Sequence, residues 1–291
     1  MRFIGEYAIP YETESKDNAA IAGLSGWMFI KEGTNGWESQ VIGHATLDEV
    51  QLLQWITIHE SRLTIARSLN VKFAQVIFPE KQSVLPLKRW GESLISDQRP
   101  AVVLSKHLLE NFLYPAEKLK QEAANAQIYY RGNSHASLSG VWLVFESLMQ
   151  IIWPERVFDF DSVQVEKKKC RHDLLLKYAS KECFEEAYLI NQSRQYQYNN
   201  ERYEITGKHL GAHFIITNDN SIYSESIAIF GDSYAYDAGF SDLFATFFKE
   251  VHFIWSNTVD FSYVIKNKID AVIVESAERY LIKPPIGDQL G

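Results

Sequence analysis

Cysteine is scarce in this chain of 291 residues, which contains only Cys170 and Cys183. The two do not form a Cys-x-x-Cys pair and have no clustered histidine partner, so the pattern argues against a structural zinc site. Two separate thiols are the simplest interpretation, and a disulfide between them is the alternative.

An excess of positive charge is also missing. The chain has 37 acidic and 29 basic residues and a net charge of −8. Sequence-independent binding to nucleic acid needs a basic surface, so nucleic acid is not expected as a partner. The sequence also has no Gly-rich phosphate loop, and it implies no nucleotide, metal or other cofactor.

Long apolar runs are absent as well. The N-terminus, "MRFIGEYAIPYETES", has no apolar core of a signal peptide, and no segment approaches the length of a membrane span. The chain as given is therefore predicted to be cytoplasmic and not inserted in a membrane, or periplasmic if a signal sequence has been removed. Hydrophobic residues make up 46% and charged residues 23%, which is typical of a globular protein.

What the sequence does contain is an alternation of helical and extended patterns. Helices are predicted at 46–70, 115–127, 138–153, 240–251 and 261–269, and strands at 71–79, 128–130, 226–230, 252–255 and 270–276. Thr46 and Glu49 form a predicted capping box at the start of the first helix. The polar, charged stretch 155–222 is predicted to be an insertion of short helix and β-hairpins within one domain that spans 1–291.

This alternation with short links predicts an α/β fold with a parallel sheet that has helices on both faces. Functional sites in such sheets form beyond the carboxyl ends of the strands. Polar groups that directly follow a predicted strand are therefore the first candidates for chemistry.

One such group is Ser233, in "AIFGDSYAYD" (228–237). A strand-to-helix turn can expose a serine nucleophile and direct backbone N–H groups at a reacting carbonyl. Gly231 would allow a close approach or an unusual backbone angle. The alternative is a plain turn in which Asp232 or Ser233 caps the next helix.

A serine nucleophile needs a base, and His135 in "YYRGNSHASLSG" is the best placed of the eight histidines. Its loop lies between a predicted strand and a predicted buried helix, so it should open beside Ser233. The alternative is that Asn133, Ser134 and Ser137 only cap that helix. The remaining seven are interpreted as structural or solvent-facing: His44, His59, His107, His172, His209, His213 and His252.

Five segments together resemble the SGNH hydrolase-like alginate O-acetyltransferases of the AlgJ/AlgX type. Their order along the chain also matches that family, in which the histidine motif precedes the serine motif. The segments are "GLSGWMF" (23–29), "VIFPEKQSVLP" (76–86), "YYRGNSHAS" (129–137), "IAIFGDSYA" (227–235) and "IDAVIVESAERYL" (269–281).

The resemblance implies that Ser233 is the nucleophile and His135 its base. It also exposes a departure, because Asn133 stands where the family has the triad aspartate, and Ala136 where it has tryptophan. An aspartate holds the imidazole in the correct tautomer and stabilises the imidazolium, and its replacement by asparagine in serine proteases lowers turnover by about four orders of magnitude.

Three explanations of Asn133 remain open at this point. Asn133 orients His135 as a neutral partner, as in Cys-His-Asn sites. Alternatively, another carboxylate replaces the aspartate, with Asp173 and Asp237 as candidates. In the third explanation the domain has lost catalysis and has kept binding.

Other residues follow from the resemblance with weaker support. Tyr234 and Arg279 are predicted to line the site together with Gly231, and the alternative for Arg279 is an ion pair with Glu275 or Glu278. Lys81 is interpreted as a solvated loop lysine, or as a residue that faces the cleft. A further pair, Trp27 and Phe29, is assigned to the core.

The resemblance implies an SGNH-type O-acetyltransferase or acetylesterase that acts on a carbohydrate or polysaccharide, with an acetyl-donor membrane protein as a possible partner. Asn133 favours the alternative, a catalytically inactive carbohydrate-binding or scaffold module of a polysaccharide-assembly system. A third hypothesis is an unrelated α/β protein in which Gly-Asp-Ser is a plain turn.

Overall fold

The computed structural model describes residues 9–32, 35–170, 172–178, 184–190, 192–196 and 212–289. Cys183, His209 and most of the tyrosine-rich part of the predicted insertion lie outside these ranges. Across the described residues, no helix is both long and apolar enough to cross a membrane.

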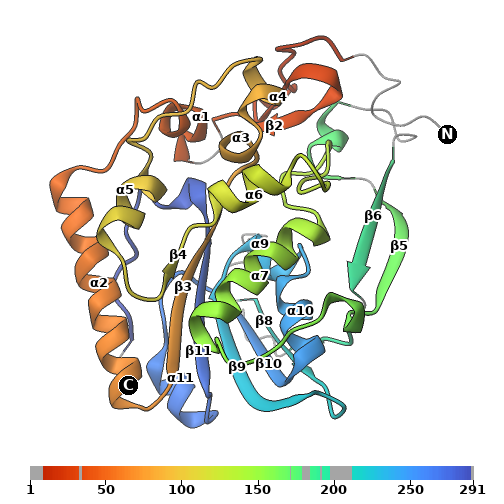
Figure 1. Ribbon diagram of the computed structural model, residues 1–291. Coiled ribbons are helices and arrows are strands. Elements are labelled where there is room, and N and C mark those ends of the chain that lie inside the picture. The colour runs from red at the N-terminus through yellow and green to blue at the C-terminus, as the bar shows by residue number, and fades with distance from the viewer. Residues whose placement is uncertain are drawn as a thin grey trace.

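A seven-stranded sheet forms the centre of the molecule, in the spatial order β4-β3-β11-β9-β10-β8-β7 (Figure 1). The first five strands in this order are parallel, and β8 and β7 are antiparallel additions at one side. The sequence therefore predicted the α/β class correctly but not the antiparallel strands. The strands are β3 (Lys72–Phe78), β4 (Phe112–Leu113), β7 (Gln195–Tyr196), β8 (His213–Thr217), β9 (Tyr223–Gly231), β10 (Phe248–Trp255) and β11 (Ala271–Ala277).

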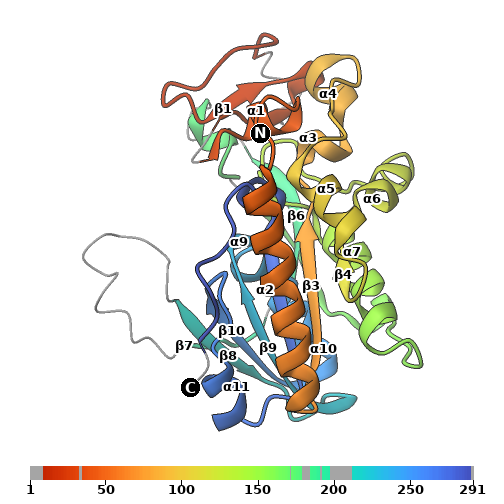
Figure 2. The same cartoon turned by 90° about the vertical axis from the view of Figure 1, so that its left-hand side faces the viewer.

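Helices cover both faces of this sheet, because side chains of the buried strands alternate between two apolar layers. Ile227 and Ile229 of β9 face the layer with α7 (Leu138–Ile152) and α10 (Phe240–Phe247). Ala228 and Phe230 face the other layer, with α2 (Glu49–Ser68) and α11 (Phe261–Lys266). Figure 2 shows α2 running along its face of the sheet.

A group of short elements lies above the carboxyl ends of the parallel strands (Figures 1 and 2). Two separate antiparallel pairs are β1–β2 and β5–β6, and the second lies at the side of the molecule; α5 and α6 flank β3 and β4. The bounds are β1 (Ala20–Ala22), β2 (Met28–Ile30), α1 (Trp37–Val41), α3 (Lys81–Val84), α4 (Pro86–Trp90), α5 (Pro100–His107), α6 (Ala116–Glu122), β5 (Val165–Cys170), β6 (Glu185–Ile190) and α9 (Ser233–Tyr236).

The predicted insertion, 155–222, contains β5, β6, β7 and β8. Of these, β7 and β8 extend the main sheet, whereas β5 pairs with β6 alone. The division of the chain into one domain with an insertion stays a prediction.

The start of α2 differs from the predicted capping box at Thr46 and Glu49. Asp48 is the cap: its carboxylate accepts from the N–H of Gln51 at 2.7 Å, and its own N–H donates to the Gln51 side chain at 2.9 Å. Leu47 and Leu52, on either side of this cap, belong to the same apolar cluster. This hydrophobic staple favours the later start over the equally plausible motif two residues upstream.

Two predicted elements are corrected by strand pairing. The helix predicted at 240–251 ends at Phe247, because residues from Phe248 onward pair with β9 and β8. The strand predicted at 128–130 is no sheet strand: Tyr129 makes one isolated bridge, to Ala136. The short strand β4 occupies the place beside β3 instead, and the Tyr129 hydroxyl donates to the carbonyl of Pro79.

Candidate active site

Ser233 is the first residue of α9, directly beyond the carboxyl end of β9. Asp232 caps this helix, because its carboxylate accepts from the N–H of Tyr234 at 3.1 Å and from that of Ala277 in β11 at 2.7 Å. The Ser233 side chain stays partly exposed. The two interpretations of Gly-Asp-Ser are therefore compatible: aspartate caps the helix and serine faces outward.

Gly231 serves a close approach and not an unusual backbone angle, since its φ is not positive. A Cβ at this position would lie 2.5 Å from Oε2 of Glu275 on the neighbouring strand. That oxygen accepts from the N–H of Asp232 at 2.9 Å. Gly231 thus lets a buried carboxyl group contact the backbone immediately before the serine.

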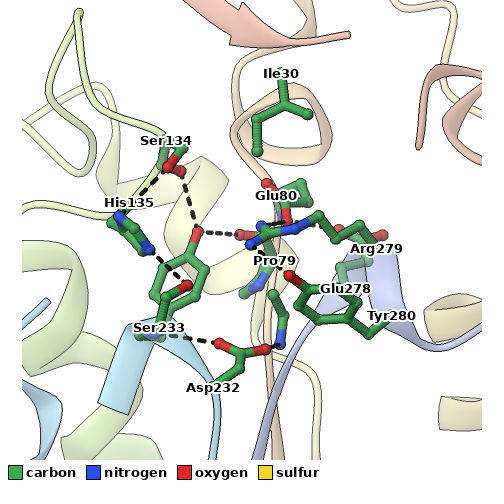
Figure 3. A network of polar contacts seen from close by, with 12 residues as sticks. Ile30, Pro79, Glu80, Ser134, His135, Asp232, Ser233, Glu278, Arg279 and Tyr280 are labelled. Carbon is green, nitrogen blue, oxygen red and sulfur yellow. Dashed lines mark hydrogen bonds and ion pairs between the residues drawn. The ribbon is translucent and has the colours of Figure 1, made fainter. Parts of the chain in front are cut away.

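His135 lies directly opposite Ser233, although the two are 98 residues apart in the chain. Its Nε2 is 2.8 Å from Oγ of Ser233 (Figure 3). The Tyr234 ring and the imidazole make a T-shaped contact, with a centroid distance of 4.8 Å. Tyr234 is fully buried, and its hydroxyl is within 3.3–3.4 Å of the carbonyls of Ser134 and Pro79. It supports the histidine loop from beneath.

Asn133 contacts the other side of the imidazole. Its Oδ1 accepts from the backbone N–H of His135 at 2.9 Å and lies 3.1 Å from Nδ1 of the same residue. Its Nδ2 lies 2.8 Å from Nδ1 of His172. An amide in this orientation accepts a hydrogen bond from the protonated Nδ1 of His135, which leaves Nε2 unprotonated and facing the serine hydroxyl.

The electrostatics suit a neutral imidazole. Although part of the ring reaches solvent, enclosure by protein lowers the pKa of His135 to about 4. The Asp173 carboxylate opposes this by raising the pKa, and positive charge at Arg279 and Lys81 adds to the lowering. At pH 7 the ring is free to accept a proton.

Behind the serine lies a pair of buried carboxyl groups. Burial and the neighbouring Asp232 raise the pKa of Glu275 well above its usual value, and burial also raises the pKa of Asp232. Two carboxyl groups this close disfavour each other's ionisation, so the protonated form of Glu275 is favoured beside the helix cap.

Arg279 does not form the ion pair with Glu275 or Glu278 that its alternative interpretation expected. It forms an ion pair with Glu80 (Figure 3). Glu278 instead accepts from Arg99 at 3.1 Å, from the Tyr114 hydroxyl at 2.7 Å and from the N–H of Glu80 at 2.9 Å. The end of β11 is thus joined to the end of β3 by buried ionic contacts.

The interpretation of Lys81 as a solvated residue is wrong, because its side chain is only 1% exposed. Its ammonium group donates to the carbonyls of Met28 at 2.8 Å and Arg131 at 3.2 Å, and lies over the Trp27 and Phe29 rings. Burial lowers the pKa of Lys81 to about 7. Phe29 is in the core as predicted, whereas Trp27 is only partly buried.

Residues 172–173 contact the site through Asn133 and Ser134. The two oxygens of Asp173 accept from the N–H and the hydroxyl of Ser134, at 2.8 and 2.5 Å. Asp237, the other candidate carboxylate, is exposed at the end of α9. Sequence patterns predicted only a structural or solvent-facing role for His172, and no spacing in "KKKCRHDLL" signals its contact with Asn133. Among the described residues, no group of three or more His, Cys, Asp or Glu side chains could hold a metal ion.

The parallel strands, the helices on both faces and the serine beyond a strand end are those of an open α/β sheet with its site at the carboxyl ends of the strands. Among solved structures, the chain is similar to PatB1 of Bacillus cereus with a sulfonyl adduct, at 14% identity and a TM-score of 0.61 over 89% of this chain and 98% of that one.

Two further structures share the fold over most of the chain. The O-acetyltransferase domain of Pseudomonas putida AlgJ is 12% identical, with a TM-score of 0.54 over 92% of this chain and 94% of that one. Pseudomonas aeruginosa AlgX is 13% identical, with a TM-score of 0.52 over 96% and 70%. These likenesses confirm the AlgJ/AlgX-type fold. No protein-family model and no curated protein matches the chain.

Proposed function

We propose that this protein is an SGNH-type O-acetyltransferase or acetylesterase that acts on a carbohydrate through Ser233 and His135. The observation that carries the proposal is the 2.8 Å contact between Nε2 of His135 and Oγ of Ser233. The orientation of Asn133 supports it, since that orientation leaves Nε2 free to act as a base.

The proposed reaction has two halves. Nε2 of His135 takes the hydroxyl proton of Ser233 while Oγ bonds to the acetyl carbon, and the carbonyl electrons move to its oxygen. The backbone N–H of Ser233 and one further donor stabilise this oxyanion. The donor alcohol then leaves with the proton from His135. In the second half, Nε2 takes the proton of a sugar hydroxyl or water while its oxygen bonds to the acetyl carbon, and the proton then passes to Oγ of Ser233 as the bond between Oγ and the acetyl carbon breaks.

Carbohydrate as the acceptor is supported by the resemblance of the five motifs, and acetyl transfer by the description of the AlgJ domain as an O-acetyltransferase. The acetyl donor, including a donor protein in a membrane, is part of the proposal and not of the geometry. The second candidate is an inactive carbohydrate-binding or scaffold module. One observation favours it: Asn133 is uncharged where the resembling family has an aspartate.

The test is p-nitrophenyl acetate turnover together with labelling by a fluorophosphonate. Ser233→Ala and His135→Ala should each lower turnover by about a thousandfold or more, and Ser233→Ala should abolish labelling. Ser105→Ala and His107→Ala on α5 are the matched controls and should leave both unchanged. A wild-type chain that neither turns over nor labels would favour the binding module, which oligosaccharide titration would then test.

A further inference from the structure

The segment between β5 and β6 touches the histidine loop at two adjacent residues. The buried His172 bonds to the Asn133 amide, and the Asp173 carboxylate bonds to the Ser134 hydroxyl. Asn133 and Ser134 in turn are the two side chains within 3.3 Å of Nδ1 of His135. Each residue of the pair 172–173 therefore acts on one neighbour of the same nitrogen.

We propose that His172 and Asp173 are positioning residues that together keep the proton of His135 on Nδ1, the task that the missing triad aspartate would perform. The proposal rests on the proposed function for its catalytic consequence. Its structural part, the position of one proton, can be measured without any turnover.

The Asp173 part follows from donor and acceptor roles. An ionised carboxylate only accepts hydrogen bonds, so the Ser134 hydroxyl must direct its proton to Asp173 at 2.5 Å. The lone pairs of Ser134 Oγ are then left for Nδ1 of His135 at 3.3 Å, and an acceptor there requires a proton on Nδ1. Asp173 is exposed on its outer side, so its direct field at the imidazole is screened and this hydrogen-bond polarity carries most of its effect.

The His172 part concerns the amide. Asn133 can direct its oxygen at His135 only while its nitrogen has an acceptor, and Nδ1 of His172 is that acceptor at 2.8 Å. The His172 ring is held in place by stacking on Tyr130, with centroids 4.8 Å apart. Burial lowers the pKa of His172, which keeps its acceptor nitrogen unprotonated at neutral pH.

The experiment measures the tautomer of His135 by ¹⁵N NMR of the labelled imidazole at neutral pH, beside kcat/KM for p-nitrophenyl acetate. His172→Phe keeps a ring against Tyr130 but removes the acceptor, and Asp173→Ala frees the Ser134 hydroxyl. We expect each to lower kcat/KM by about three- to tenfold and the double variant by about ten- to a hundredfold, with Nδ1 losing its proton in parallel.

A second pair of variants separates positioning from packing. In Asp173→Ala the freed hydroxyl of Ser134 can donate to Nδ1 and stabilise the wrong tautomer. Adding Ser134→Ala removes that donor, so the Asp173→Ala, Ser134→Ala double variant should be more active than Asp173→Ala alone. A purely structural role predicts the opposite order. Asp17→Asn, which removes the partner of Lys177 in the same segment, is the control and should change neither readout.

Two outcomes would overturn the proposal. One is a His135 that keeps its proton on Nδ1 in the His172→Phe, Asp173→Ala double variant. The other is an Asp17→Asn variant that reproduces the loss, which would indicate loosening of the segment. If the wild type turns over no ester, the proposed function fails, yet the NMR result still decides whether the two residues fix the proton.

Discussion

The two sides of Ser233 are built from different chemistry. On one side His135, Asn133 and His172 exchange hydrogen bonds between uncharged groups, and two of the three are partly exposed. On the other side Arg279 and Glu80 form an ion pair in the buried end of the sheet. The side with His135 can change the positions of its protons with little change in free energy. The side with Arg279 and Glu80 holds the backbone beside the serine in place. The comparison suggests that variants of the first side should alter rates, and variants of the second should alter stability.

Removing one partner of the ion pair between Arg279 and Glu80 should have the largest effect, and this effect is on the free energy of unfolding. Arg279→Met leaves Glu80 buried without its partner, and loss of one member of such a pair costs about 3–5 kcal/mol of unfolding free energy. Burial already raises the pKa of Glu80 to about 7, so protonation will place the loss near the lower figure. Urea denaturation measures it.

The matched control is an exposed pair of the same kind, Arg67 with Glu110, whose side chains are 61% and 54% exposed. Arg67→Met should cost about 1 kcal/mol or less. Equal losses of unfolding free energy in Arg67→Met and Arg279→Met would contradict the conclusion that the buried ion pair stabilises the fold.

Adding a negative charge beside His135 should change the rate of the esterase reaction and not the free energy of unfolding. Asn133→Asp puts a carboxylate oxygen where the amide now donates to His172, so His172 must take a proton on Nδ1. The new charge raises the pKa of His135 and makes it a stronger base. The tautomer is already correct, so we expect a gain in esterase kcat/KM of about tenfold and not of several orders of magnitude. NMR should show both histidines titrating at higher pH than in the wild type; unchanged titration of both would contradict this.

The acid limit of activity tests the environment of His135. Its pKa is about 4 in the folded protein, below its ordinary value of 6.5, so the base stays unprotonated until the pH falls to about 4. The kcat/KM of the esterase reaction should therefore decline near pH 4, measured by acetate release. Because the unfolded chain binds this proton more tightly, His135 also makes the fold less stable as the pH falls from 6.5 to 4. A decline of kcat/KM centred near pH 6.5 would contradict this prediction and would show that His135 titrates like an ordinary histidine.

Replacing the buried Lys81 should give the smallest change in the rate of the esterase reaction. Lys81→Met keeps the length of the side chain against Trp27 and Phe29 but removes the donor to the Met28 carbonyl, whereas the Arg131 carbonyl still accepts from the N–H of Met28. The expected loss of stability is about 1–3 kcal/mol. Esterase kcat/KM should change less than twofold, because the lysine contacts the backbone of the histidine loop and not its ring. If Lys81→Met changed the activation free energy of the esterase reaction more than the free energy of unfolding, Lys81 would belong with the residues that act on His135.

Sequence reasoning reached the α/β class and the meeting of His135 with Ser233, because both follow from local patterns and from the rule that sites form beyond strand ends. It missed contacts that depend on distant packing. Because Phe248 pairs with β9, the helix is shorter than predicted. The strand beside β3 is β4, and no sheet strand forms at the predicted 128–130. The contacts of His172 and the burial of Lys81 have no local signal, since both residues look like ordinary members of polar segments.

The pairing of β3 with β11 also has a consequence for synthesis. Lys72 lies opposite Ala271, so one of the central strands leaves the ribosome about 200 residues before its neighbour. At about 5–20 residues per second, β3 waits some ten to forty seconds with one edge unsatisfied. Strand β9, which precedes Ser233, also pairs with β11, so the site around Ser233 forms only after residues 271–277 have been synthesised. Nascent chains stalled before residue 271 should therefore recruit chaperones and show no reactive serine.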